Sequence, residues 1–398
     1  MRLHLSNLAN SKYKENNKLA KYGKKNHVKL DPLAYNICLL GESKVGKTTL
    51  IKEVCEKLSG EDGYMFLECG QERGADAIEG INHVNCPEWN MDYDEITNSV
   101  GFEDVCDDII DNKTSEYPDL KVVIVDTYDQ LINIAESESI RLWNRDNPDK
   151  RTNSINAAWG GFGRGEKKAI EIMFDKIAEL RSVGVSTIII GHIKTKDISD
   201  PVSGETYQIL TSDQQQNYFN ALKKNLHFLG LAYIDRQIVK EKTGKKNIVT
   251  NKEEQVNKVK GESRKIKFRD DNFCVDSGSR FAEIIDEIDL DADQFITAIT
   301  DAIKAEQSKS GRSFDETKAE QEAKEAEKLK EIAKAEQNKK EAKKLEDVVS
   351  KITDFIKENK SNMDNIKPII AKSKELGYDN PTLITDIDDA NKVLALIS

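Results

Sequence analysis

Residues 41–48 read Gly-Glu-Ser-Lys-Val-Gly-Lys-Thr and match the pattern G-x-x-x-x-G-K-[ST], which restricts the fold more than any other feature of this chain. The apolar run 34–40 precedes the motif and the helical pattern 49–58 follows it, so the motif has the strand and helix context that it requires. Gly41 and Gly46 permit backbone angles that turn successive N–H groups toward phosphate oxygens. The first turn of the helix adds unpaired N–H groups that favour an anion. These residues predict a phosphate-binding loop in an α/β fold.

The side chains of this loop predict which cofactors it binds. Lys47 can reach the β- and γ-phosphates of a nucleotide, and the Thr48 hydroxyl can ligate Mg²⁺. No N-K-x-D segment follows the strand that ends at Asp126, so guanine specificity has no support, and we expect ATP and Mg²⁺. The residues expected to hold the nucleotide are Gly41, Glu42, Ser43, Lys44, Val45, Gly46, Lys47, Thr48 and Thr49.

Length and composition favour a soluble chain with several parts. A sequence of 398 residues suggests two or three domains, or one large domain with appendages. No apolar run approaches the length of a membrane helix, and the N-terminus lacks the apolar core of a secretory signal. The six cysteines are scattered without a C-x-x-C pair, which argues against a disulfide framework or a zinc site. We therefore expect a cytoplasmic protein with no membrane partner.

The net charge of −11 is unevenly distributed along the chain. Residues 1–30 hold eight basic side chains and one acidic side chain, and residues 240–269 hold eleven basic and four acidic ones. Two basic segments on an acidic protein suggest local contact with a polyanion. A solvated lysine-rich tail and a solvated hairpin are the alternative interpretation.

Short β-rich runs alternate with helical stretches between residues 31 and 302, which predicts one α/β domain with a mostly parallel central sheet. Extended segments within 229–270, with a turn at 243–246, predict a basic β-ribbon inside this domain. The expected strands are 35–40, 64–68, 81–86, 120–126 and 185–192, and the expected helices are 46–58, 101–112, 166–182 and 213–226.

The two ends of the chain differ from this domain. Residues 1–30 form a polar, basic arm that we expect to be poorly ordered until it binds something. Residues 303–347 consist almost entirely of Ala, Glu, Lys and Gln, with too few apolar residues for a coiled coil. They predict a solvated, charged helical linker. Apolar periodicity returns in 348–398 and predicts a small helical domain.

A carboxylate at the end of a predicted strand supplies the second part of the expected site. Residues 122–126 read Val-Val-Ile-Val-Asp. Ligands of open α/β sheets bind beyond the carboxyl ends of the strands, so Asp126 is expected to orient Mg²⁺ beside the phosphate loop. A buried strand that ends in aspartate without a metal is the alternative. Two further strands are expected between the loop strand and the Asp126 strand, which is characteristic of the RecA-like and AAA-type branch of P-loop ATPases.

Three other side chains are candidates for catalysis. Glu68 and Glu72 both fall near the carboxyl end of a predicted strand, and either can activate the attacking water. We favour Glu72, which begins the segment Glu-Arg-Gly. His192 is expected at the end of strand 185–192, where it can sense the γ-phosphate; a structural histidine is the equal alternative.

These motifs together resemble those of phage-encoded RecA-like ATPases of the nucleotide-binding, single-strand-annealing recombination family. Besides the phosphate loop and Asp126, the resemblance rests on the segments 72–74 (Glu-Arg-Gly), 159–163 (Trp-Gly-Gly-Phe-Gly), 191–192 (Gly-His) and 276–281 (Asp-Ser-Gly-Ser-Arg-Phe). It implies single-stranded DNA binding, ATP-dependent homo-oligomerisation into a ring or filament, and a role in phage recombination or replication inside the bacterial host. The basic arm, the insertion 240–269 and the C-terminal helices inherit no function from it.

The loops expected after Asp126 and after His192 are the candidate DNA-binding segments, about 144–166 and 193–212. Aromatic and basic side chains in them suit sequence-independent binding of single strands, through stacking and phosphate contacts. A mobile loop with an anchored tryptophan is the alternative. One basic side chain of 264–269, or Arg280, can instead act as a finger on a neighbouring subunit. The candidate DNA contacts are Trp159, Phe162, Arg164, Lys194, Lys196, Arg264, Lys265 and Lys267.

The sequence therefore predicts an ATP hydrolase that acts on single-stranded DNA in annealing or strand pairing. A ring-forming helicase or helicase loader is a second interpretation. A non-catalytic scaffold, in which ATP only locks an oligomer, is a third. In each case the C-terminal helical domain is a candidate surface for replication or recombination proteins.

Overall fold

The computed structural model describes residues 26–199, 203–246, 253–269 and 276–397. Contacts divide the chain into two compact units, Met1–Val54 with His192–Gln321 and Cys55–Gly191 with Glu322–Ser398. Most of the predicted basic arm, residues 1–25, lies outside the described residues. Within the described ranges, no helix is both long and apolar enough to cross a membrane.

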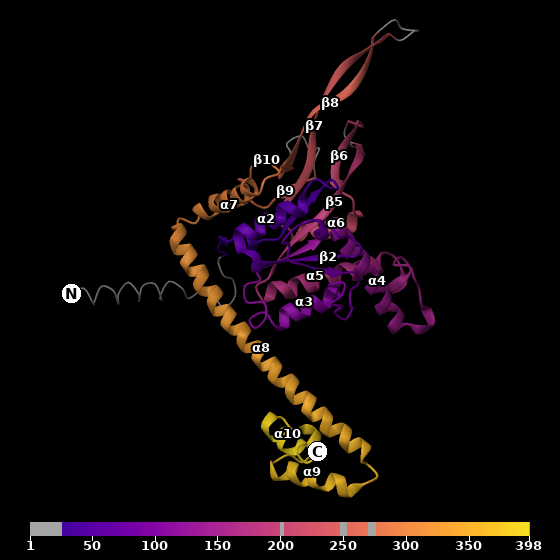
Figure 1. Ribbon diagram of the computed structural model, residues 1–398, viewed down its shortest axis with the longest axis vertical. Helices are drawn as coiled ribbons and strands as arrows, with labels where there is room; N and C mark the ends of the chain where they lie inside the picture. Colours follow the sequence, from indigo (N-terminus) through magenta and orange to yellow (C-terminus); the bar gives the residue numbers. More distant parts are fainter. Residues whose placement is uncertain (1–25, 200–202, 247–252, 270–275, 398) are drawn as a thin grey trace, which may run out of the picture. The chain divides into compact units, whose positions relative to one another are not determined.

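Parallel strands form the centre of the segment Cys55–Gly191 (Figure 1). Their order is β3 (His83–Cys86), β2 (Tyr64–Cys69), β4 (Val122–Asp126) and the first part of β5 (Ser186–Ser199). Every residue of β4 is buried, as its unbroken apolar run requires of a strand covered on both faces. Because β2 and β5 occupy both edges of β4, the strand of the phosphate loop is not a neighbour of β4. The separation predicted for the RecA-like and AAA-type branch is confirmed.

Three helices pack with these strands: α3 (Phe102–Asp111), α4 (Tyr128–Asp146) and α5 (Arg164–Ser182). α5 contacts both α3 and α4, and α4 contacts β2 and β4. The sequence did not predict α4, because the polar residues Glu138 and Ser139 lie on its buried face and weaken the apolar periodicity. Short 3-10 helices lie at Pro32–Ala34, Glu61–Gly63, Ala75–Ala77, Pro148–Lys150, Ala158–Gly160 and Pro381–Leu383.

The other unit contains the phosphate-loop strand. β1 (Ile37–Gly41) pairs in parallel with β7 (Phe228–Lys246), and β8 (Glu253–Lys267) runs antiparallel to β7. Two short strands, β9 (Gly278–Ser279) and β10 (Glu287–Asp289), add antiparallel pairs to β7 and β8. α6 (Gln216–Asn225) and α7 (Ala292–Ser308) lie in this unit, and α2 (Lys47–Ser59) and α8 (Phe314–Glu358) begin in it. The predicted class, a P-loop fold with a mostly parallel central sheet and helices, is confirmed.

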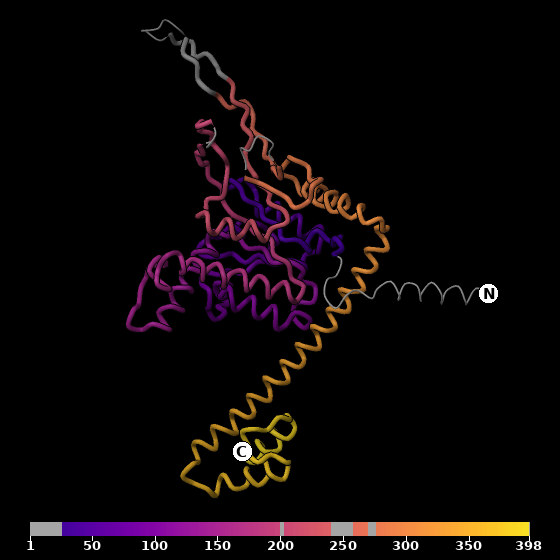
Figure 2. Tube along the Cα trace, turned by 180° about the vertical axis from the view of Figure 1, so that it is seen from behind, coloured from indigo at the N-terminus to yellow at the C-terminus, as the bar shows by residue number. Residues whose placement is uncertain are grey.

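β7 and β8 continue beyond the sheet as a long ribbon, and the two strands lie side by side in both views (Figures 1 and 2). The predicted β-ribbon is therefore confirmed, but the predicted turn at 243–246 is wrong, because these residues belong to β7 and Lys246 pairs with Glu253. A register shift between Lys242 and Lys246 accommodates Gly244 within the strand.

The strand that carries His192 does not end there. β5 continues to Ser199, and its second part pairs antiparallel with β6 (Thr206–Ser212), from Ile193 opposite Ser212 to Ser199 opposite Thr206. The predicted strand end and the predicted loop after it are therefore wrong. Most side chains of this hairpin are exposed and polar, so its sequence pattern is typical of a loop. The two strands nevertheless pair through their backbone groups.

The C-terminal part is helical, as predicted, but its boundaries differ. α7 ends at Ser308 and α8 (Phe314–Glu358) begins after a break that contains Gly311 with φ +68°, so the charged linker is not one helix from residue 303. α8 is followed by α9 (Met363–Glu375) and α10 (Ile387–Leu394) (Figure 2). The end of α8 packs with these helices around a small core of Ile352, Ile369, Ile384, Ala390 and Val393.

α8 is not solvated along its whole length, contrary to the prediction for a charged linker. Glu336 is 7% exposed, and its carboxylate accepts hydrogen bonds from the Thr114 backbone N–H at 2.6 Å and from the Thr114 hydroxyl at 2.7 Å. Lys340 donates to the Ser115 hydroxyl at 2.9 Å, and Lys339 pairs with Asp111. The sequence could not show these contacts, since they join segments more than 200 residues apart.

Candidate functional site

The phosphate loop has a backbone that glycine makes possible. A Cβ atom on Gly41 would lie 2.8 Å from the Ala232 carbonyl oxygen. The pairing of β1 with β7 therefore leaves no room for a side chain at this position. Gly46 has φ +109° and Lys44 has φ 63°, both in the left-handed region. The Leu50 N–H donates to the Gly46 carbonyl at 3.0 Å, which starts the hydrogen bonding of α2 directly after the loop.

Lys47 is folded over this loop. Its side chain is 6% exposed, and Nζ donates to the Gly41 carbonyl at 3.1 Å and to the Glu42 carbonyl at 2.9 Å. Thr48 follows in the first turn of α2, which contains no acidic residue that would repel an anion. The glycine backbone and the buried ammonium fit a bound phosphate, with Lys47 as its cation and Thr48 as the hydroxyl next to it.

The remaining loop residues contribute in different ways. The Glu42 side chain accepts from the Ile234 N–H at 3.0 Å and lies 3.7 Å from Arg236, so it fastens the loop to β7. Val45 is fully buried and anchors the loop. The exposed loop residues are Ser43, Lys44 and Thr49.

Asp126 ends β4 and is 5% exposed. Its register partners on the neighbouring strands are Glu68 of β2 and Ile190 of β5, so the sheet brings Asp126 and Glu68 together. Within the described residues, the buried hydroxyl oxygen of the next residue, Thr127, has no hydrogen-bond partner. An acidic group and an unused hydroxyl at the carboxyl end of a parallel strand are a suitable donor set for a hard cation such as Mg²⁺.

The two candidate glutamates have different surroundings. Glu68 is 1% exposed, and its Oε1 accepts from the Ala75 N–H at 2.6 Å, so it fixes the loop that follows β2. Burial raises the pKa of Glu68, and His83 and Arg73 counteract part of this effect. Glu72 lies in that loop and is half-buried. The structure therefore gives Glu68 a structural contact and leaves Glu72 in the more accessible position.

His192 lies within β5, where it is half-buried and its carbonyl accepts from the Asp213 N–H at 3.1 Å. Its place in mid-strand differs from the predicted strand end, but it remains at the point where the pairing of β5 changes from β4 to β6.

The glycine-rich segment before α5 is tightly turned and partly exposed. Gly160, Gly161 and Gly163 have positive φ, and Phe162, with φ 55°, is 97% exposed. Trp159, in contrast, is anchored: its Nε1 donates to the Ser139 carbonyl and hydroxyl at 3.1 Å, and its ring lies 5.9 Å from that of Trp143. Arg164 is exposed at the start of α5.

The basic candidates for DNA contact fall into two groups. Lys194 donates to the Asp213 carbonyl at 2.8 Å, and Lys265 pairs with Glu287 at 2.7 Å and with Asp235 at 3.7 Å, so both are engaged in their own unit. Lys196 and Arg264 are exposed, and Lys267 is half-buried.

Two arginines that are candidates for a finger on a neighbouring subunit lie close to other segments of their own chain. The Arg264 guanidinium lies at the phosphate loop, with Nη1 3.5 Å from the position of a Cβ on Gly46. Arg280 donates to the carbonyls of Leu226, at 2.8 Å, and Lys224, which gives it a structural role at the end of α6.

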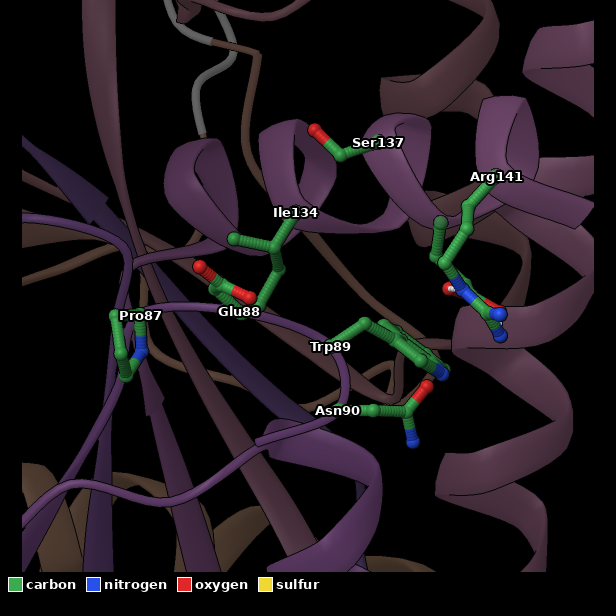
Figure 3. Close-up of a pocket in the computed structure, with 8 residues that line it drawn as sticks. Pro87, Glu88, Trp89, Asn90, Ile134, Ser137 and Arg141 are labelled. Carbon is green, nitrogen blue, oxygen red and sulfur yellow. Dashed lines mark hydrogen bonds and ion pairs between the residues drawn. The ribbon is translucent and has the colours of Figure 1, made fainter. Parts of the chain in front are cut away.

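The sequence did not reveal a pocket between residues 87–90 and α4, with a volume of about 340 Å³ (Figure 3). Trp89 and Ile134 supply its apolar surface, and Arg141 binds Glu138 through two hydrogen bonds, at 2.6 and 2.8 Å. It could not be predicted, because half of its lining belongs to the unpredicted helix α4.

Comparison with known proteins agrees with the loop geometry. The model of the AAA domain family matches residues 33–260, which is more than half of the chain. No curated protein sequence matches. Among solved structures, a KaiC-like protein from the hyperthermophilic archaeon Pyrococcus horikoshii OT3 is 15% identical, with 59% of this chain and 78% of that chain covered and a TM-score of 0.29. The family match, together with the phosphate loop at 41–48, shows that the chain belongs to the AAA domain family of P-loop NTPases.

Proposed function

We propose that this protein is a Mg²⁺-dependent ATPase that acts on single-stranded DNA. The observation that supports it most directly is the phosphate loop, in which the buried Lys47 ammonium bonds to the carbonyls of Gly41 and Glu42. A lysine held by these carbonyls is in position to exchange them for phosphate oxygens, which are stronger acceptors for a cation.

The proposed roles follow from the chemistry of phosphoryl transfer. Lys47 binds the phosphates, and Thr48 and Asp126 hold Mg²⁺, which neutralises phosphate charge when it is bound. Glu72 accepts a proton from the attacking water, because its half-buried position after β2 leaves it more accessible than Glu68. His192 senses the γ-phosphate and relays its presence to the hairpin of β5 and β6, whose pairing begins at the next residue, Ile193.

The DNA part of the proposal is supported by Phe162. An aromatic ring that is 97% exposed on a glycine-rich turn offers a stacking face for a base, and Arg164 follows it with an exposed positive charge. Lys196 is a further exposed cation in the β5–β6 hairpin. We further propose a homo-oligomer, in phage recombination or replication in the host cytoplasm; these points are supported by the sequence resemblance alone. The C-terminal helices, to which the resemblance assigns no function, are proposed as a site for partner proteins.

The decisive experiment is ATP turnover with and without a poly-dT oligonucleotide across a salt series, with Lys47→Ala as the control. We expect stimulation by DNA that weakens as salt rises, and no turnover in the variant. Unchanged turnover in Lys47→Ala would contradict the ATPase assignment, and an absence of stimulation at every salt concentration would contradict the DNA assignment. Directional unwinding of a forked duplex would favour a helicase. ATP binding with negligible turnover, unaffected by Glu72→Gln, would favour a scaffold.

A further inference from the structure

A cluster of three potential ligands lies outside the proposed nucleotide site. The side chains of Glu68, Asp76 and His83 each place one ligand atom within 4.8 Å of the others. Glu68 comes from the end of β2, His83 begins β3, and Asp76 lies in the short helix Ala75–Ala77 between them. The three residues therefore join two neighbouring strands and the loop that connects them.

The strongest indication that this cluster binds a ligand is the second carboxylate oxygen of Glu68. Oε1 accepts from the Ala75 N–H, but Oε2 is buried and has no hydrogen-bond partner in the described part of the chain. Nε2 of His83 lies 3.8 Å from this oxygen, which is too far for a hydrogen bond. A buried carboxylate oxygen without a partner is unfavourable, so an additional group between Glu68 and His83 would stabilise this arrangement.

We propose that Glu68, Asp76 and His83 bind a divalent transition-metal ion, with Zn²⁺ as the best fit. One imidazole nitrogen and two carboxylate oxygens form a three-ligand set that leaves a fourth position for water. Ligand atoms bound to one zinc ion are roughly 3.4 Å apart in tetrahedral geometry, so the site closes with a small movement of its ligands. Asp76 is exposed and can supply this movement by rotating its side chain. The expectation that the chain has no zinc site came from its cysteines, and this site uses none.

The site would order the loop that carries Glu72. Arg73, which follows Glu72, donates to the Asn85 side chain of β3 at 3.0 Å, so the loop is already tied to β3 on one side. A metal ion on Asp76 would tie its other end to β2 and β3. This consequence concerns the conformation of the loop, and metal binding itself does not depend on the proposed ATPase activity.

Metal binding can be measured on the full-length chain, freed of metal by a chelator and kept without nucleotide. Co²⁺ would be titrated and followed by its visible absorption, and the bound Co²⁺ would then be displaced with Zn²⁺. We expect one Co²⁺ per chain with the intense bands of a four-coordinate ion. Loss of a residue that only hydrogen-bonds to a metal ligand typically weakens metal affinity about 10–100-fold. His83 is a proposed direct ligand, so His83→Ala should weaken Co²⁺ affinity at least as much. Asp76→Asn changes an exposed side chain and tests the site with little risk to folding.

Matched controls separate this site from other metal-binding groups. His27→Ala and Glu79→Gln remove an exposed histidine and an exposed glutamate outside the cluster, and both should bind Co²⁺ as the wild type does. Asp126→Asn removes the proposed Mg²⁺ ligand and should also retain the Co²⁺ spectrum. The proposal is overturned if wild type binds no Co²⁺, if His83→Ala and Asp76→Asn bind it with unchanged affinity, or if Asp126→Asn abolishes the spectrum.

Discussion

Nη1 of Arg264 lies 3.5 Å from the position that a Cβ atom on Gly46 would occupy. Arg264 comes from β8 and Gly46 from the phosphate loop, so the ribbon of β7 and β8 places a cation beside the loop of its own chain. The guanidinium is exposed, and it makes no hydrogen bond or ion pair with other side chains in the described ranges. A cation in this position favours a bound triphosphate, since arginine matches the geometry of phosphate oxygens.

Arg264→Ala is therefore expected to weaken ATP binding about tenfold or more, as the loss of a charge-assisted hydrogen bond would. Equilibrium binding of a fluorescent ATP analogue in the presence of Mg²⁺ measures this effect. Lys260→Ala removes an exposed charge from the same strand and is the matched control, with unchanged ATP affinity expected. If Arg264→Ala binds ATP normally but binds single-stranded DNA less well, the arginine is a DNA contact, as the sequence first indicated.

Gly41→Ala should disrupt the start of the phosphate loop. The new Cβ would lie 2.8 Å from the Ala232 carbonyl oxygen and 2.9 Å from the Ala232 Cβ, where neither strand can easily move. Overpacking of this kind costs about 1–3 kcal/mol, measurable as a lower free energy of unfolding in urea. Gly261→Ala is the control, since a Cβ there meets nothing within 4 Å, and it should change the stability by less than about 0.5 kcal/mol. Equal effects of the two substitutions would contradict the close packing of β1 against β7.

Local sequence patterns were sufficient for the parts of the fold that depend on neighbouring residues. The phosphate loop and the strand before Asp126 are each defined within one short segment, and the structure has both where they were predicted. The contacts of Arg264 with the loop and of Glu336 with Thr114 arise between segments far apart in the sequence, and no spacing rule reveals them. The approach of His83 to Glu68 depends on the pairing of β2 with β3. The β5–β6 hairpin was missed for a different reason: its strands pair through backbone while their side chains remain polar and exposed.

Phe162→Ala is expected to weaken binding of single-stranded DNA. The ring is 97% exposed, and stacking of one base on an aromatic side chain is worth about 1–3 kcal/mol, so a loss of roughly five-fold or more is expected. Fluorescence anisotropy with a labelled oligonucleotide measures it. Ile96→Ala is the control, because Ile96 is 95% exposed and offers no stacking face. If both variants bind DNA as the wild type does, the glycine-rich turn is not a DNA contact.

Glu336→Gln should loosen the contact of α8 with the end of α3. The carboxylate accepts two hydrogen bonds from Thr114, at 2.6 and 2.7 Å, and a neutral amide accepts them more weakly. Hydrogen bonds to charged groups contribute about 1.5–3 kcal/mol each, so faster amide exchange around residues 112–116 is expected by mass spectrometry. Glu331→Gln, an exposed change on the same helix, should leave this exchange unchanged. Unchanged exchange in Glu336→Gln would mean that α8 does not remain on α3 in solution.

The pH dependence of stability provides a test of the buried state of Glu68. Burial raises the pKa of this carboxyl above its ordinary value of 4.5. The folded chain therefore holds the Glu68 proton more tightly than the unfolded chain does. The stabilisation from this difference is fully present below pH 4.5 and is lost as the pH rises through the folded pKa.

Glu68→Gln removes this titration and keeps an oxygen that can accept from the Ala75 N–H. Relative to wild type, the variant should become progressively more stable as the pH rises from about 4.5, because only the wild type must then bury a charge. Urea unfolding at a series of pH values, with a chelator present to remove metal ions, measures the difference. His83, Asp76 and Arg73 influence the pKa of Glu68 electrostatically, and they are the same in both proteins. A difference in stability that stays constant with pH would show that the Glu68 carboxyl is not held in a buried environment.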